Sequence, residues 1–196
     1  SRNTAFGYGS LGTLNYDGGG YNTAVGYETG TAMTTGIRNT IVGGLAGDAL
    51  TTGSNNIAMG YGALGSEDTG SRNIAIGENA LNNANYDGNG YNVAIGHEAG
   101  VSVSTGLLNV LIGGIAGDAL TTGSDNVAIG YAALSTEDGH GKNIAIGVQA
   151  LEDQNAGADA LNIAIGHQAG RNVTTGVQNT IVGGEAGDAI TTGSRN

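Results

Sequence analysis

The chain has 196 residues, of which 39 are glycine and none is proline or cysteine, and its formal net charge is −11. The absence of cysteine excludes disulfide bonds and thiolate metal sites, and the absence of an apolar run of about 18 residues excludes a membrane-spanning helix. With six Lys and Arg against 17 Asp and Glu, we expect no nucleic-acid partner and repulsion from anionic lipid.

An asparagine followed by alternating apolar residues and a glycine recurs along the whole chain. Successive copies begin 19, 17, 17 and 17 residues apart, and the same order of steps then repeats. A short fixed period is typical of a solenoid, and these units are too short for helix pairs. We therefore expect an all-β, parallel β-solenoid with coils of 17–19 residues. The complete coils begin at Asn3, Asn22, Asn39, Asn56, Asn73, Asn92, Asn109, Asn126, Asn143, Asn162 and Asn179.

Four coils form a block of 70 residues, and the chain holds blocks 3–72, 73–142 and part of a third, 143–196. We expect a single elongated repeat domain over residues 1–196. The pattern is already running at Ser1-Arg2-Asn3 and is still running at Ser194-Arg195-Asn196. We therefore interpret the chain as a fragment of a longer fibre.

Each coil carries one predicted strand, as in Asn73-Ile74-Ala75-Ile76-Gly77. Ile74 and Ile76 share one face of this strand, and Ala75 points to the other. We expect the large residues to fill the interior of the coil and the alanine side to meet a close neighbour. In the third of the four coil types the middle residue is large, and the residue after the turn glycine is then a second glycine, which predicts that the two compensate in volume. The middle residues are Ile41, Leu111 and Ile181, and the glycines are Gly44, Gly114 and Gly184.

The recurrent asparagine is predicted to form a ladder. Asparagine side chains bond to turn backbone, and stacked at a strand spacing of about 4.8 Å they can also bond along the stack. A solvated turn residue would explain one such asparagine but not a whole row in register.

The motif Asn-x-Ala-Ile-Gly followed by a small residue (Ala80, Ala99, Ala133, Ala169) resembles the head repeats of YadA-like trimeric autotransporter adhesins. It is similar also to repeats in phage tail fibres. The resemblance covers essentially the whole chain and implies a left-handed parallel β-roll in which three chains pack side by side. The repeats of that family are typically shorter, about 14 residues, so the shape of the coil is expected to differ. A homotrimer would also cover the alanine side, since one strand per coil buries little apolar surface.

Three turns, each Gly-Gly-x-Ala-Gly-Asp, suggest calcium ligands at Asp48, Asp118 and Asp188. Calcium takes six to eight oxygen ligands, and these turns recur only once in each block. The simpler interpretation is that each aspartate holds its turn through backbone N–H groups.

The loops of the 19-residue coils carry candidate contact residues for a glycan or protein receptor: Tyr16, Asp17, Tyr86 and Asp87. Aromatic residues at exposed loops favour recognition, although the third block has no Tyr-Asp-Gly. His97 and His167 share one register and are weak metal candidates; packed or solvent-facing imidazoles are the alternative. His140 is expected to be exposed in its loop.

No catalytic set of residues is visible, and we expect neither an enzyme nor a cofactor. Ile76-Gly77-x-x-Ala80 also fits the hexapeptide rule of left-handed β-helix acyltransferases, but 17 is not a multiple of six. Ice binding is disfavoured because Thr-Thr pairs occur in only some coils. The leading hypothesis is a structural shaft or head segment of a trimeric extracellular attachment fibre, on a virion tail or a bacterial surface. The alternatives are a glycan- or Ca²⁺-binding module and, less favoured, a hexapeptide-type acyltransferase.

Overall fold

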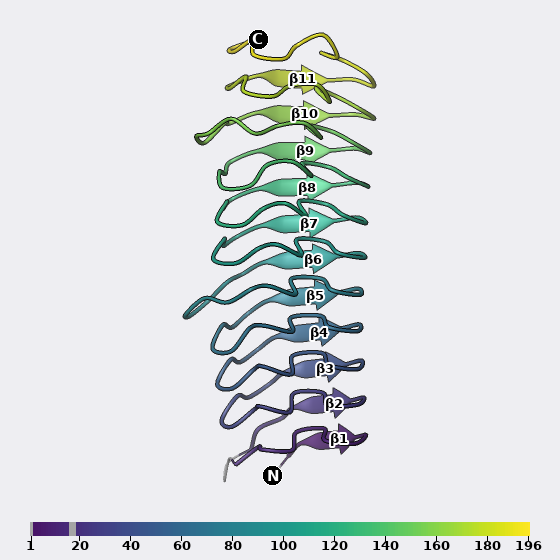
Figure 1. Cartoon of the computed structure of the whole chain (residues 1–196), viewed down its shortest axis with the longest axis vertical. Coiled ribbons are helices and arrows are strands. Elements are labelled where there is room, and N and C mark those ends of the chain that lie inside the picture. The colour runs from purple at the N-terminus through teal and green to yellow at the C-terminus, as the bar shows by residue number, and fades with distance from the viewer. Residues whose placement is uncertain (1, 16–18) are drawn as a thin grey trace.

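A computed structural model describes residues 2–15 and 19–196 and shows a parallel β-solenoid (Figure 1). Within these residues every regular element is a three-residue strand, and no helix of the length and apolarity needed to cross a membrane is found. The strands are β1 (Thr4–Phe6), β2 (Thr23–Val25), β3 (Thr40–Val42), β4 (Ile57–Met59), β5 (Ile74–Ile76), β6 (Val93–Ile95), β7 (Val110–Ile112), β8 (Val127–Ile129), β9 (Ile144–Ile146), β10 (Ile163–Ile165) and β11 (Thr180–Val182).

The strands form one sheet in which each strand pairs only with its neighbours in sequence, in the order β1 to β11. The register is in step throughout: Ile74 pairs with Val93, Ala75 with Ala94, and Ile76 with Ile95. The 19-residue coils that begin at Asn73 and Asn143 keep this register because their two extra residues lie outside the strand, in loops that protrude on one side of the stack (Figure 1). The predicted all-β solenoid with coils of about 17 residues is confirmed.

The recurrent asparagines are buried and form a continuous ladder. The backbone N–H of Asn109 donates to Oδ1 of Asn92 at 2.9 Å, and Oδ1 of Asn109 accepts from the N–H of Asn126 at 3.0 Å. The Asn109 amide Nδ2 also donates to the carbonyl oxygen of Gly123 at 2.9 Å, across the same coil. Such a side chain joins two coils and closes its own, although Asn73 Nδ2 donates to Asn56 Oδ1 instead, at 3.1 Å.

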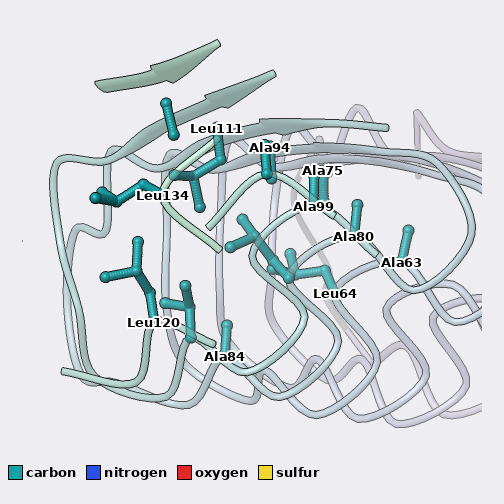
Figure 2. Close-up of a cluster of buried hydrophobic side chains, with 14 of the residues drawn as sticks. Ala63, Leu64, Ala75, Ala80, Ala84, Ala94, Ala99, Leu111, Leu120 and Leu134 are labelled. Carbon is teal, nitrogen blue, oxygen red and sulfur yellow. The ribbon is translucent and has the colours of Figure 1, made fainter. Parts of the chain in front are cut away.

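The two faces of the strand are the reverse of the prediction. The middle residue points into the coil, where Ala75 and Ala94 are fully buried and stack on each other (Figure 2). The large residues on either side, such as Ile74 and Ile76, point outward and are half-buried. The interior is narrow beneath the strand, so a methyl group fills it, and the alanines leave no methyl-lined side for a neighbouring chain.

The volume compensation also differs from the prediction. Leu111 is buried inside the solenoid (Figure 2), and the glycines that make room for it are Gly100 and Gly117. A Cβ on Gly100 would lie 2.5 Å from Leu111 Cδ1, and one on Gly117 would lie 2.8 Å from Leu111 Cδ2. A Cβ on Gly114 would meet only Tyr131, at 3.5 Å, because Gly114 lies on the outside of the coil.

Candidate functional site

The outward face of the sheet is an apolar surface that runs along the solenoid. Two rows of Ile, Val and Thr run along it, and a third row follows the turn glycine of each coil and carries Tyr27, Tyr61 and Tyr131. These tyrosines are 56–57% exposed, and the rings of Tyr8 and Tyr27 stack with centroids 5.6 Å apart. We call these three rows the strand face. A contiguous apolar surface of this kind marks an interaction site.

His97 and His167 belong to the third row of the strand face, and both are exposed. His97 Nδ1 lies 3.9 Å from Glu98 Oε2. The two histidines are four coils apart, which at a coil spacing of about 4.8 Å separates them by roughly 19 Å. One chain therefore does not bring them together around a metal ion.

Tyr86 is not the exposed contact residue that the sequence suggests, because it is only 7% exposed. Its hydroxyl group donates to Asn73 Oδ1 at 2.5 Å and accepts from Asn92 Nδ2 at 3.2 Å. Burial raises the pKa of Tyr86 well above its ordinary value. Tyr86 is thus part of the asparagine ladder, whereas Asp87 is exposed and accepts a hydrogen bond from Thr69 Oγ1 at 2.8 Å. Tyr16 and Asp17 lie outside the described residues.

Gln154 takes over the role of Tyr86 in the third block, where the loop has no tyrosine. It is fully buried, its Oε1 accepts from Asn162 Nδ2 at 2.5 Å, and its Nε2 donates to the carbonyl oxygen of Thr174 at 3.1 Å. The loops of the two blocks therefore differ in sequence but supply the same kind of polar partner to the ladder. This function is structural and needs no ligand.

The three aspartates of the Gly-Asp turns lie apart from the strand face. Burial raises the pKa of Asp48 and of Asp118, while the N–H groups of their own turns lower it by hydrogen bonding. Asp48 borders a shallow polar depression of about 240 Å³ with Asn79 and Asn82, and Asp188 borders another of about 290 Å³ with Arg171. The first depression has Asp48 as its one carboxylate, and the second has Asp188 and Glu185 beside a guanidinium. Neither set reaches the six to eight oxygen ligands of a calcium site. These turns fit the backbone-holding interpretation.

His140 is half-buried rather than exposed. Its Nδ1 lies 3.2 Å from Oε1 of Glu137, a residue that is fully buried, and its backbone N–H donates to the same oxygen at 3.1 Å. Asp138 places a carboxylate near both, with one ligand atom of each residue within 4.8 Å of the others. The Glu-x-x-His spacing within one turn is the sequence signal for this cluster, and the equivalent turn of the first block has glycine, Gly70, where the cluster has His140.

Glu67, the counterpart of Glu137, is fully buried, and burial raises its pKa. Its Oε1 accepts from the Gly70 N–H at 2.6 Å. Because the native state holds the proton more tightly than the unfolded chain, we expect the free energy of unfolding to fall as the pH rises above about 4.3. Glu67→Gln should flatten this pH dependence, since Gln154 shows that a glutamine fits the same place in a coil.

Urea denaturation between pH 4 and pH 8 measures this effect. Asp153→Asn is the matched control, because Asp153 is exposed and its replacement should leave the pH profile unchanged. A profile of Glu67→Gln that keeps the slope of the parent chain would contradict the prediction.

In the part of the chain that the structure describes, no serine or threonine hydroxyl is hydrogen-bonded to a histidine. The candidate site is therefore the strand face, because its exposed apolar side chains can contact another surface. Searches of protein-family models, of curated proteins and of solved structures give no match to this chain.

Proposed function

We propose that this chain is a rigid segment of an extracellular attachment fibre, on a virion tail or a bacterial surface, in which three copies pack side by side as left-handed β-rolls. The resemblance of the repeats to YadA-like adhesins and phage tail fibres supports this proposal. So does the structure of the coil, which repeats one set of backbone bonds without interruption along the stack. Such a stack transmits force along its axis and resists bending.

The single observation that supports self-association best is the strand face. Three large apolar side chains of this face are left exposed: Phe6 at 75%, and Met59 and Ile165 at 39% each. At about 4.8 Å per coil the face is roughly 50 Å long, and the three residues of each strand make its flat part roughly 10 Å wide. With the third row added, this area is of the same order as the ~800 Å² that each partner contributes to a stable protein interface.

The proposed trimer places the strand faces toward a common axis. This is a revised assignment of the interface, because the alanines that the sequence suggested for it are in the interior of each coil. The side chains of the second row, which are the last residues of the strands, pack at the axis. The tyrosines and histidines of the third row lie at the border of the interface. Loops on the other sides remain free to contact a receptor.

The mass in solution tests the proposal. Sedimentation equilibrium should give about three times the mass of one chain, 19.2 kDa. Replacing both Met59 and Ile165 with lysine should yield a folded monomer, since each lysine would place a charge in a dry interface. Asn83→Lys with Asn172→Lys, at exposed positions outside the strand face, should leave the trimer intact. A folded parent chain that sediments as a monomer would refute the proposal.

A further inference from the structure

Nearly all the cations of this acidic chain lie in one row. Five of the six Lys and Arg residues occupy the position immediately before a ladder asparagine, and they are Arg2, Arg38, Arg72, Lys142 and Arg195. All five are exposed. This row, which we call the cationic rim, runs along the edge of the strand face at the start of the strands. Asp125 is the one acidic residue in it.

The opposite edge of the strand face has the opposite charge. The two residues after each turn glycine form this edge, which we call the acidic rim. It carries Glu28, Glu78, Glu98 and Glu185, and no Lys or Arg. These glutamates are exposed or half-buried. The strand face is therefore bordered by a positive edge and a negative edge, which lie on either side of the three-residue strands.

The cationic rim is largely free of carboxylate partners inside its own chain. Among residues 2–15 and 19–196, Arg38, Arg72 and Arg195 form no ion pair. Arg72 instead lies over the ring of Tyr91, with its guanidinium carbon 5.6 Å from the ring centroid. Lys142 is paired with Asp159 Oδ2 at 2.5 Å, and this contact raises the pKa of Lys142. Three guanidinium groups are thus available to a neighbouring molecule.

The two rims distinguish between the ways in which strand faces can meet. Rotation about an axis parallel to the stack keeps the chains running in the same direction, and it places the cationic rim of one copy beside the acidic rim of the next. A two-fold axis perpendicular to the stack reverses one chain and places like rims together. Opposite charges attract and like charges repel across an interface border, and such charges fix orientation more than they add affinity.

We propose that the charged rims orient the copies of this chain in parallel, with the cationic rim of each copy against the acidic rim of its neighbour. This inference rests on the self-association proposed above and adds the direction and the register of the chains. In a symmetric parallel assembly equivalent coils lie at the same height, so Arg72 of one copy lies level with Glu78 of the next, because both flank β5.

Charge reversal on each rim tests the inference. The first variant carries Arg38→Glu, Arg72→Glu and Arg195→Glu, and the second carries Glu28→Lys, Glu78→Lys and Glu185→Lys. In low salt each should associate roughly a hundred-fold more weakly than the parent chain, because three pairs that lie level or one coil apart across the rims become repulsive. The chain with all six replacements should recover most of the association, since the rims have then exchanged charge. Salt at 0.5 M should reduce these differences by screening.

The second variant also separates the rims from net charge. It lowers the net charge from −11 to about −5, which would favour association if overall repulsion were the only electrostatic effect. Weakening in both variants supports the rims. Strengthening in the second variant, or unchanged association in both, overturns the inference while leaving the oligomer itself intact. A monomeric parent chain would instead overturn the proposed function.

Spin labels test the direction of the chains. The chain has no cysteine, so single cysteines can be placed at Thr35, Thr105 and Thr175, three exposed residues at one position of coils four apart. In a parallel assembly the distance between equivalent labels should be the same for all three. An antiparallel pair centred near Thr105 would separate the labels at Thr35 by roughly 38 Å along the stack, and that result would refute the parallel orientation.

Discussion

Replacing Asn109 with alanine is expected to lower the free energy of unfolding by about 2–6 kcal/mol, because two buried hydrogen bonds are lost together and each leaves a backbone group unsatisfied. The side chain accepts from the Asn126 N–H at 3.0 Å and donates to the Gly123 carbonyl at 2.9 Å. Both backbone groups would be left without a partner beside a methyl-sized gap. The Asn109 N–H would keep its own bond to Asn92.

Urea denaturation followed by circular dichroism measures this loss. Asn83→Ala provides the matched control, since Asn83 is exposed and its replacement should change the unfolding free energy by less than about 0.5 kcal/mol. Equal midpoints for the two variants would show that the ladder contributes little to the stability of the stack.

Replacing Gly130 with alanine should destabilise the solenoid by at least about 4 kcal/mol or prevent it from folding. The φ angle of Gly130 is +137°, which L-residues rarely adopt, and a Cβ there would lie 2.3 Å from the carbonyl oxygen of Gly147 in the next coil. The corner cannot relax without breaking the bond from the Gly147 N–H to Ile129 O, 2.7 Å long. Conformational strain and a backbone clash therefore act together.

Gly157→Ala is the control for this second variant. Gly157 also has a positive φ, +69°, but no atom lies within 4 Å of a Cβ built there. Its replacement should cost only about 1 kcal/mol, from the left-handed backbone alone. Thermal unfolding of the two variants separates the strain from the clash. A melting temperature of Gly130→Ala close to that of Gly157→Ala would contradict the prediction.

The period and the register of the strands could be predicted because they depend on features that the sequence repeats directly. Alternation around Ala75 defines a strand, and the spacing of the asparagines defines the stack. Asparagine at the same place in every coil leaves few arrangements other than a ladder, and the hydrogen bonds of Asn92, Asn109 and Asn126 have that form.

The direction in which each face points could not be predicted from alternation alone. Alternation separates Ile74 and Ile76 from Ala75, but it does not say which side encloses the coil. The interior is partly filled from elsewhere, by residues such as Leu81 and Leu120, so little space remains beneath the strand. Bulk at that point needs a glycine opposite, as Leu111 needs Gly117, and this relation crosses the coil rather than following the strand.

The corners also escaped prediction. From Asn22 onward, the residue before each ladder asparagine adopts a positive φ even where it is bulky, with 53° at Tyr21, 57° at Arg38 and 61° at Leu108. No local preference favours this conformation for such residues. The stack imposes it, because the Arg38 N–H donates to the Gly20 carbonyl at 2.7 Å and the Leu108 N–H donates to the Gly90 carbonyl at 2.9 Å.

The in-step register has a consequence for how such a chain can change in length. Excision of residues 73–142 would join Arg72 to Asn143, and Asn143 occupies the same place in its coil as Asn73. The new junction would reproduce an existing one, and the rod would shorten by four coils, about 19 Å. Unequal recombination between blocks is therefore expected to change the length of the rod in fixed increments of four coils while keeping the register of the strands.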